Sequence, residues 1–405
     1  MSKDMVDGIG PLSGLRVIDL TRILAGPFCT MNLGDMGAEI IKVEEPKRGD
    51  DTRSWGPPFS GGEAAYFLGI NRNKKSVALN LKDPRGQKIL SDLLANADVL
   101  IENFKPGTLC EWGFTNDWFK TEAPHLIHCA ITGYGDKGPK AGMPGYDFLL
   151  QAESGLMSIT GESTGNAQKL GVAIVDVCTG QYAAMCILAA VNSRQVTGKG
   201  QRIDLSLYNT SLSILINVAS NYLISGKSPT RYGNGHPNIV PYRDFRCKEG
   251  EIALAVGNDL QFRKFATFLG HSDWSDDSRF KNNSDRVNNR EECEGAITKA
   301  LSKKTAAEWL ELFEKEGIPC GVINTINDAL ESEQARANNM VIEMNHIVAG
   351  EIKALGIPYQ FSETPAEIKS APPLLGEHTR EILLGVLDFS ETDIERLCSD
   401  GVVGL

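Results

Sequence analysis

The fold is decided by residues 15–43, LRVIDLTRILAGPFCTMNLGDMGAEIIKV. The stretch opens with an apolar run typical of a buried strand and turns at Ala25-Gly-Pro27. It continues as a helix predicted from about Phe28 to Met36. Gly37 suits the end of that helix, and a second β-branched run, Glu39–Val43, follows it. This strand–helix–strand order predicts one crossover unit of a parallel sheet.

The same alternation recurs along the first half of the chain. Asp83 and Pro84 form a typical helix start, with an N-cap aspartate and a proline at the first helical position. Further strands are predicted at 76–81, 99–101, 126–132, 172–175 and 201–207, and helices at 85–96, 177–190 and 211–224. The pattern predicts an α/β fold whose large domain is a Rossmann-like parallel sheet.

The pattern of predicted strands and helices changes after the linker-like stretch that begins at Ser225. Shorter strands such as 251–256 alternate with polar helices, which is typical of a smaller α+β domain. We therefore predict three segments: 1–224 for the large domain, 225–330 for the small domain, and 331–405 returning to the large domain.

Composition excludes several classes of protein. The chain has 405 residues and a formal net charge of −11, so a large nucleic-acid interface or an anionic membrane surface is not expected. No uninterrupted apolar stretch reaches the roughly 18–20 residues that span a bilayer. The nine cysteines are scattered and never spaced Cys-x-x-Cys, so we expect a reduced compartment and no metal site. No targeting pattern is visible at the N-terminus, which favours the cytoplasm, or the mitochondrial matrix if a presequence has been removed.

Two motifs resemble known binding sites but lack the required context. Gly133–Gly138 matches Gly-x-Gly-x-x-Gly, yet Pro139, Gly142 and Pro144 follow at once, so the stretch is predicted to be a loop rather than a dinucleotide site. His128 lies three residues after His125 within a predicted strand, which favours a packed histidine over a metal ligand.

Asp176 is the strongest candidate for a catalytic residue in the sequence. It is predicted to end the strand 172–175 and to begin a long alanine-rich helix. One interpretation is an N-cap. The other is a nucleophile at the carboxyl end of a parallel strand, kept ionised by the helix dipole. A basic run at Arg72, Lys74 and Lys75 leaves phosphate binding and a solvated surface equally open.

Several stretches, in order along the chain, resemble the class III CoA-transferases, the CaiB/BaiF family. They are 12–21, 25–27, 34–44, 49–53, 102–107, 133–135, 173–176, 197–201 and 375–379. Four others, at 56–58, 71–76, 217–223 and 239–242, most resemble the succinate–glutarate branch of that family.

The resemblance implies a large α/β domain, a smaller domain and an interlocked homodimer. It implies that Asp176 is the nucleophile, with Tyr146 and Asp147 beside it. The residues it assigns to coenzyme A are Leu24, Ala25, Leu79, Lys82, Asn103 and Phe104. His236, in a loop that covers the site in some relatives, is expected among the substrate-binding residues. Glu45 and Glu111 stand where some relatives have arginines, so those contacts are not expected here.

The implied reaction moves coenzyme A from an acyl-CoA, succinyl-CoA being expected, to a dicarboxylate such as glutarate through an aspartyl-CoA thioester. No permanently bound cofactor is needed. We expect the amides of Val177 and Cys178 to stabilise the oxyanion. The distal carboxylate of the substrate is expected to bind Arg53, Arg72 or Lys75.

Two alternatives stay open. One is an acyl-CoA racemase of the same fold, which would need a histidine where this chain has Tyr146. The other is a CoA-binding protein without catalysis.

Overall fold

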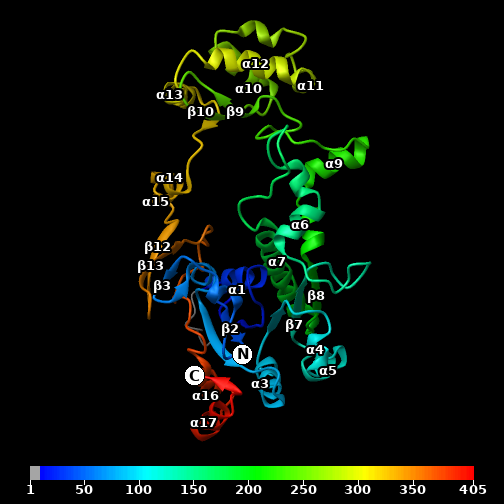
Figure 1. The fold of residues 1–405 in the computed structure, drawn as a ribbon, viewed down its shortest axis with the longest axis vertical. Helices are drawn as coiled ribbons and strands as arrows, with labels where there is room; N and C mark the ends of the chain where they lie inside the picture. Colours follow the sequence, from blue (N-terminus) through cyan, green and yellow to red (C-terminus); the bar gives the residue numbers. More distant parts are fainter. Residues whose placement is uncertain (1–9) are drawn as a thin grey trace. The chain divides into compact units, whose positions relative to one another are not determined.

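The computed structural model describes residues 10–405, which divide into two compact units (Figure 1). The first unit contains residues 10–154, Gly171–Ile214 and Glu333–Leu405. The second contains Gly155–Leu170 and Leu215–Ser332. The second unit therefore takes in 155–170 and 215–224, which the sequence placed in the large domain.

The first unit is built on a seven-stranded sheet with the order β14-β5-β2-β1-β6-β7-β8. All neighbouring pairs are parallel except β14 with β5. The strands are β1 (Arg16–Asp19), β2 (Glu39–Glu44), β5 (Lys74–Leu79), β6 (Val99–Glu102), β7 (Ile127–Thr132), β8 (Arg202–Ser206) and β14 (Val403–Gly404). The predicted α/β class with a large parallel sheet is confirmed.

Helices cover both faces of this sheet. On one face α1 (Ala25–Asp35) and α7 (Ile174–Thr197) pack with β1, β6 and β7 around Val17, Cys29 and Ile187. On the other face α3 (Pro84–Ala95), α16 (Thr379–Gly385) and α17 (Glu391–Ser399) enclose a second core. The predicted start of α3 is confirmed, since the Asp83 carboxylate accepts from the Arg85 N–H and Pro84 is its first residue.

α7 is the central helix of its layer. By length and composition it is apolar enough to cross a membrane. Its residues Ala183, Ile187 and Ala190 are nevertheless buried against the sheet and α1, as in the core helix of a globular protein. The contact with α1 is close, because a Cβ at Gly180 would lie 2.5 Å from the Ala25 carbonyl oxygen.

Two predicted elements are wrong. Residues 172–175 do not form a strand, because α7 already begins at Ile174. The single helix predicted at 211–224 is two helices, α8 (Leu207–Ser213) and α9 (Ile216–Ser225), separated at Ile214 and Leu215. Both stretches are apolar and short, and periodicity alone does not separate a buried strand from a helical turn.

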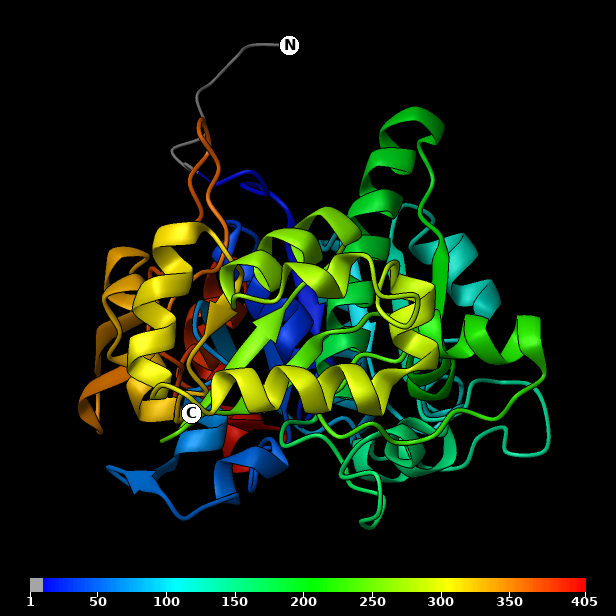
Figure 2. The same ribbon diagram turned by 90° about the horizontal axis from the view of Figure 1, so that it is seen from above.

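The second unit has its own core between a three-stranded sheet and a set of helices. The sheet has the order β11-β10-β9, with β9 (Tyr242–Arg246), β10 (Glu251–Ala255) and β11 (Cys320–Gly321). Helices α10 (Asp259–Phe268), α12 (Arg290–Leu301) and α13 (Ala306–Glu316) pack on one face of it around Phe262, Ile297 and Phe313 (Figure 2).

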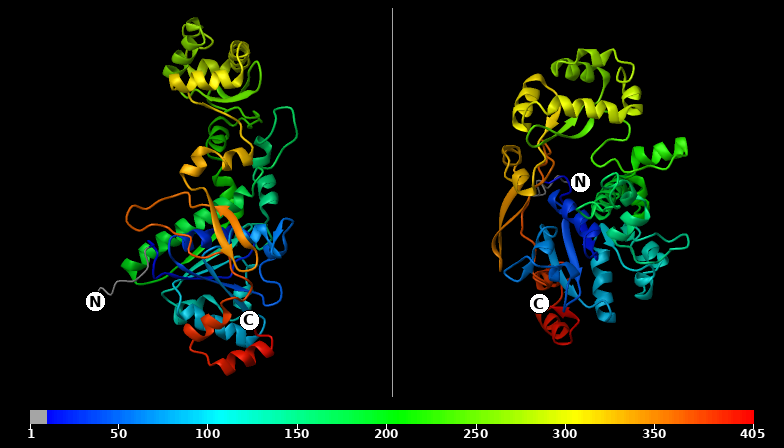
Figure 3. Two further views of the ribbon diagram at one scale, coloured as in Figure 1. Left: turned by 90° about the vertical axis from the view of Figure 1, so that its left-hand side faces the viewer. Right: turned by 45° about the horizontal axis from the view of Figure 1, so that its top comes forward.

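The chain then returns to the first unit. It forms the antiparallel hairpin of β12 (Val341–His346) and β13 (Gly350–Leu355), in orange in Figure 3. β14 ends the described chain by pairing Val403 with Leu79 of β5. The edge of the parallel sheet is thus completed by residues from the far end of the sequence.

Candidate active site

Asp176 lies in the first turn of α7, and Asp147 is the residue that caps this helix. The Val175 N–H donates to Asp147 Oδ1 at 2.8 Å, and the Asp176 N–H approaches the same oxygen at 3.4 Å. Asp147 itself begins α6 (Asp147–Glu153). The N-cap interpretation of Asp176 is therefore wrong. Its own carboxylate accepts no hydrogen bond from residues 10–405 and stays available for chemistry.

The environment of Asp176 favours its neutral form. Burial, and then the neighbouring Asp147 charge, raise the pKa of Asp176 from 3.8 to about 7. The sequence predicted the opposite, an anion stabilised by the helix dipole. The dipole contributes only about 0.3–1 kcal/mol at an ordinary exposed site, so burial and a like charge outweigh it.

Asp176 lines a cavity of about 600 Å³ in the first unit, which we call the Asp176 cavity. Five of the other residues predicted for the site share it: Leu24, Ala25, Asn103, Phe104 and Tyr146. The wall also includes residues that no sequence motif had singled out as site residues: Arg22, Ile23, Lys105, Met143 and Leu207. Most residues of the cavity wall lie in turns at the carboxyl ends of parallel strands, where open α/β sheets bind their ligands.

Asn103 has a structural role that the resemblance did not indicate. Its Oδ1 accepts from the Arg22 N–H at 3.0 Å, and its Nδ2 donates to the Arg22 carbonyl at 2.9 Å. The side chain thus pairs with both backbone groups of one residue. It ties the turn after β6 to the turn after β1.

Tyr66 is a further neighbour of the candidate nucleophile. Burial raises the pKa of its phenol, and the charges of Asp176 and Asp147 raise it further. Its ring lies edge-on to Trp55, with centroids 5.4 Å apart. Nothing in the local sequence marks Tyr66, because it lies in the short helix α2 (Ala65–Leu68), far along the chain from Asp176.

The predicted oxyanion amides are already used. The Val177 N–H donates to the Ala173 carbonyl at 3.1 Å, and Cys178 lies deeper in the same helix. That prediction is wrong, because α7 begins two residues before Asp176. Leu24 and Ala25, at the start of α1, line the Asp176 cavity.

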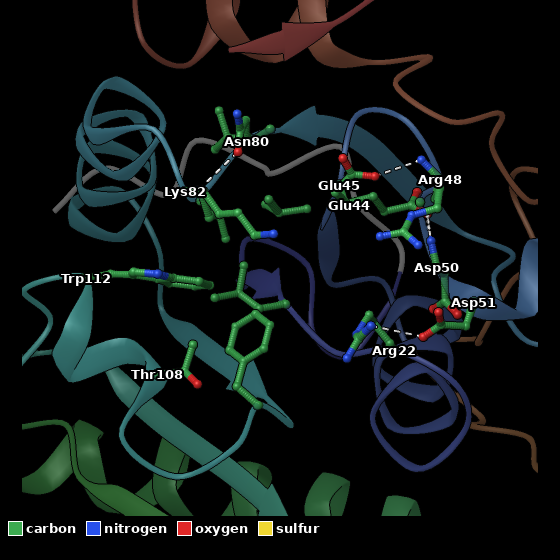
Figure 4. A pocket seen from close by; sticks show the side chains of 16 residues that line it. Arg22, Glu44, Glu45, Arg48, Asp50, Asp51, Asn80, Lys82, Thr108 and Trp112 are labelled. Atoms are coloured by element: carbon green, nitrogen blue, oxygen red, sulfur yellow. Dashed lines mark hydrogen bonds and ion pairs between the residues drawn. The ribbon is translucent and has the colours of Figure 1, made fainter. Parts of the chain in front are cut away.

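A second cavity of about 480 Å³, the Lys82 cavity, adjoins the first at Arg22 and Phe104. It holds the other two residues predicted for coenzyme A, Leu79 and Lys82. Figure 4 shows Lys82 and Arg48 approaching this cavity from opposite sides, with the Trp112 ring beside Lys82. Neither basic side chain forms an ion pair within residues 10–405.

Glu45 stands in the Lys82 cavity at a position where some relatives have arginine. Its Oε2 accepts from the backbone N–H groups of Lys47 and Arg48, at 3.1 and 2.8 Å. The carboxylate is thus turned toward its own chain and shapes the loop that presents Arg48. Arg48 itself lines the Lys82 cavity.

The basic residues predicted for the distal carboxylate lie outside both cavities. The Arg53 guanidinium pairs with Glu44 at 2.8 Å and stacks on Phe67. The Arg72 guanidinium pairs with Asp35 at 2.6 Å.

Lys75 is also committed elsewhere: its ammonium bridges Glu39 and Glu381, at 3.0 and 2.8 Å. The cations that do line the Asp176 cavity, within residues 10–405, are Arg22 and Lys105. These are the cationic groups available to pair with a substrate carboxylate bound in this cavity.

His236 belongs to the second unit. Its Nδ1 accepts from the Asn238 N–H at 3.0 Å, while burial and the nearby Arg290 guanidinium lower its pKa. Arg290 also donates to the His236 carbonyl at 2.8 Å. The loop around His236 is therefore held in place by its own unit.

Comparison with known proteins identifies the family of the chain. The model of CoA-transferase family III matches residues 12–379. A succinyl-CoA:glutarate CoA-transferase of Mus musculus is 46% identical over 98% of this chain and 91% of the relative. A succinate–glutarate CoA-transferase of Agrobacterium fabrum is 41% identical over 94% of this chain and 96% of its own length.

The fold is found in solved structures as well. The crystal structure of a CAIB/BAIF family protein from Brucella suis matches with a TM-score of 0.81 and 42% identity, covering 93% of this chain and 99% of that one. The family match covers most of the chain, and relatives above 40% identity cover nearly all of it. The chain belongs to CoA-transferase family III.

Proposed function

We propose that the protein transfers coenzyme A from succinyl-CoA to glutarate, with Asp176 as the covalent nucleophile. The observation that carries this proposal is the Asp176 carboxyl, which has no hydrogen-bond donor among residues 10–405 and lines a cavity of about 600 Å³. The named activities of relatives 41–46% identical to this chain support the choice of substrates.

The reaction begins when the ionised Asp176 attacks the thioester carbonyl of succinyl-CoA. The C–S bond breaks, which gives a succinyl–aspartyl anhydride and the CoA thiolate. The thiolate then attacks the aspartyl carbonyl, so succinate leaves and Asp176 becomes an aspartyl-CoA thioester. Glutarate attacks this thioester, which releases the thiolate and gives a glutaryl–aspartyl anhydride. The thiolate then attacks the glutaryl carbonyl, so glutaryl-CoA forms and the Asp176 carboxylate leaves. One thioester is exchanged for another, so no ATP is needed.

The two cavities divide the substrate between them. We assign the acyl group and thioester to the Asp176 cavity, and the nucleotide end of coenzyme A to the Lys82 cavity. In the latter, Lys82 and Arg48 offer unpaired charge to phosphates, and Trp112 offers a flat face to the adenine.

We assign the distal carboxylate of the dicarboxylate to Lys105, which lines the Asp176 cavity and has no ion-pair partner in residues 10–405. Replacing Lys105 by Met should raise the KM for glutarate more than the KM for a monocarboxylate acceptor. Equal losses for both acceptors would assign Lys105 to coenzyme A instead.

We also propose that the protein is a homodimer. Helix α9 is apolar over much of its length but has no buried residue, and Leu223 and Ile224 are 79% and 87% exposed. A helix of this kind is typical of a surface covered by another chain.

The decisive experiment is intact-protein mass spectrometry after addition of succinyl-CoA without acceptor. The wild type should gain the mass of a CoA thioester, and the peptide containing Asp176 should carry it. Asp176→Asn should gain nothing and lose the transferase activity. A protein that binds coenzyme A but never forms the adduct would overturn the proposal.

A further inference from the structure

We propose that Asp50 is a positioning residue for the acylation of Asp176, because it holds a strained turn that forms one wall of the Asp176 cavity. The inference rests on the proposed function, since it concerns the same covalent step. It adds a residue that does not line the Asp176 cavity: Asp50 borders the Lys82 cavity, but it is only 1% exposed and its carboxylate is bound within the protein.

The strained residue is Ile23, in the turn between β1 and α1. Its φ angle is +70°, in the left-handed region that β-branched residues avoid. Such a conformation persists only where the surroundings impose it, and it is concentrated at functional sites. The neighbours Arg22, Leu24 and Ala25 line the same cavity as Asp176, so this turn fixes the wall of the site.

The Asp50 carboxylate supplies the constraint on one side of the turn. Both of its oxygens approach the Ile23 N–H, at 3.1 and 3.3 Å. Oδ2 also accepts from the Lys42 ammonium at 2.9 Å, and the side chains of this ion pair are completely buried. Thr52 binds Oδ1 through its N–H and hydroxyl, at 3.0 and 2.8 Å.

These partners keep the carboxylate ionised and fixed. The Lys42 ammonium and the Thr52 donors hold the pKa of Asp50 at about 2, against the effect of burial. The Lys42 ammonium also donates to the Thr21 carbonyl at 2.8 Å, so the ion pair joins β2 directly to the turn. Figure 4 shows Asp50 and Asp51 beside the Arg22 turn at the edge of the Lys82 cavity.

Asn103 completes the clamp on the other side. Its side chain pairs with the N–H and C=O of Arg22, so two consecutive residues of the turn are held by two different loops. The helix α1 starts at Ala25, immediately after the turn, and α7 packs on Ala25 at Gly180. A change at Ile23 would therefore move the start of α1 relative to Asp176.

The test compares single-turnover acylation of Asp176 by succinyl-CoA, followed by intact mass, in four variants. Asp50→Asn keeps the shape of the side chain but weakens its hold on the turn. We expect it to slow acylation about 10- to 100-fold, the cost of a displacement near 1 Å at a reacting centre. The dissociation constant for free coenzyme A should change much less.

Relief of the strain provides the distinguishing readout. Glycine adopts φ near +70° without a steric penalty, so Ile23→Gly removes the need for the clamp. The double variant Ile23→Gly/Asp50→Asn should acylate within about threefold of Ile23→Gly alone, because the two residues act through one interaction.

Asp35→Asn is the matched control for loss of a buried ion pair. Asp35 is 1% exposed, pairs with Arg72 and lines neither cavity. This variant should melt at a lower temperature while keeping the wild-type acylation rate. If Asp50→Asn does not fold, Asn103→Ala releases the same turn without leaving a buried charge, and Ile23→Gly should rescue it in the same way.

The possible results separate the two proposals. A wild type that forms no adduct overturns the proposed function. A wild type that forms it, with Asp50→Asn at an undiminished rate, overturns only the positioning role. The positioning role is also overturned if the double variant acylates as slowly as Asp50→Asn. It is overturned as well if Asp35→Asn slows acylation as much as Asp50→Asn does.

Discussion

The proposed role of Asp176 and its surroundings act in opposite directions: a nucleophile must be ionised to attack a carbonyl, yet Asp176 is buried next to a second carboxylate. Because its pKa is raised to about 7, a large share of the free enzyme carries the neutral acid near neutrality. We expect the rate of acylation to rise with pH through about 7. A single-turnover pH profile would show this.

Asp147→Asn tests the origin of that pKa. The substitution keeps an oxygen that caps α7 but removes the like charge, so the pKa of Asp176 should fall and the pH profile should move toward lower pH. Burial, the larger cause, persists, so the pKa should stay above 3.8. A profile that does not move would contradict the assignment of Asp147.

The raised pKa of Asp176 should also lower the stability of the folded protein. A carboxyl whose pKa is higher in the folded than in the unfolded chain destabilises the fold as pH rises from about 4 to 7. Asp176→Asn should therefore raise the Tm, and the gain should be larger at pH 8 than at pH 5. Differential scanning calorimetry at both values would measure it, and an equal gain at both would contradict the raised pKa.

Among the elements, the pair α1 and α7 matters most, because its close approach brings the wall of the cavity to Asp176. A Cβ at Gly180 would lie 2.5 Å from the Ala25 carbonyl oxygen. Gly180→Ala should therefore force the helices apart and destabilise the protein by about 1–3 kcal/mol, the usual cost of overpacking. Acylation should slow as well, because Ala25 lines the cavity.

Gly295 provides the matched control for this prediction. It lies in α12 with no atom within 4 Å of its ideal Cβ. Gly295→Ala should stabilise the protein by about 0.5–1 kcal/mol through helix propensity alone. Urea unfolding of both variants would compare them, and the same sign for both would contradict the packing argument.

The sequence predicts elements that have a local pattern, but not those that depend on contacts between distant segments. Apolar runs and cap residues predicted the strands of the parallel sheet between 15–20 and 201–207, apart from the wrongly predicted strand at 172–175, and also the start of α3. The start of α7 did not, because its cap is Asp147, almost thirty residues earlier in the chain. Tyr66 and the clamp at Ile23 were also missed, since contacts between distant loops leave no local pattern. The ion pairs of Arg53 and Arg72 were missed for the same reason.

For the whole molecule, the exposed apolar helix α9 leads to a prediction about assembly. Leu223→Glu with Ile224→Glu should shift the protein from dimer toward monomer, because both side chains would carry charge into the covered surface. Sedimentation-velocity ultracentrifugation would show the shift.

Leu260 is a suitable control for this prediction. It is 71% exposed but stands between the polar residues Asp259 and Gln261, as single surface leucines commonly do. Leu260→Glu should leave the sedimentation coefficient unchanged. A wild type that sediments as a monomer would contradict the proposed homodimer.

The pairing of β14 with β5 also constrains how the protein is made. On the ribosome, β5 emerges early, and the backbone groups on its outer edge meet their partners only when residues 378–404 have been translated. Leu79, at the end of that edge strand, lines the Lys82 cavity. The edge of β5 therefore stays open to pairing with other chains until this late segment has been made, and the wall of the Lys82 cavity at Leu79 is fixed only when β14 has paired with β5.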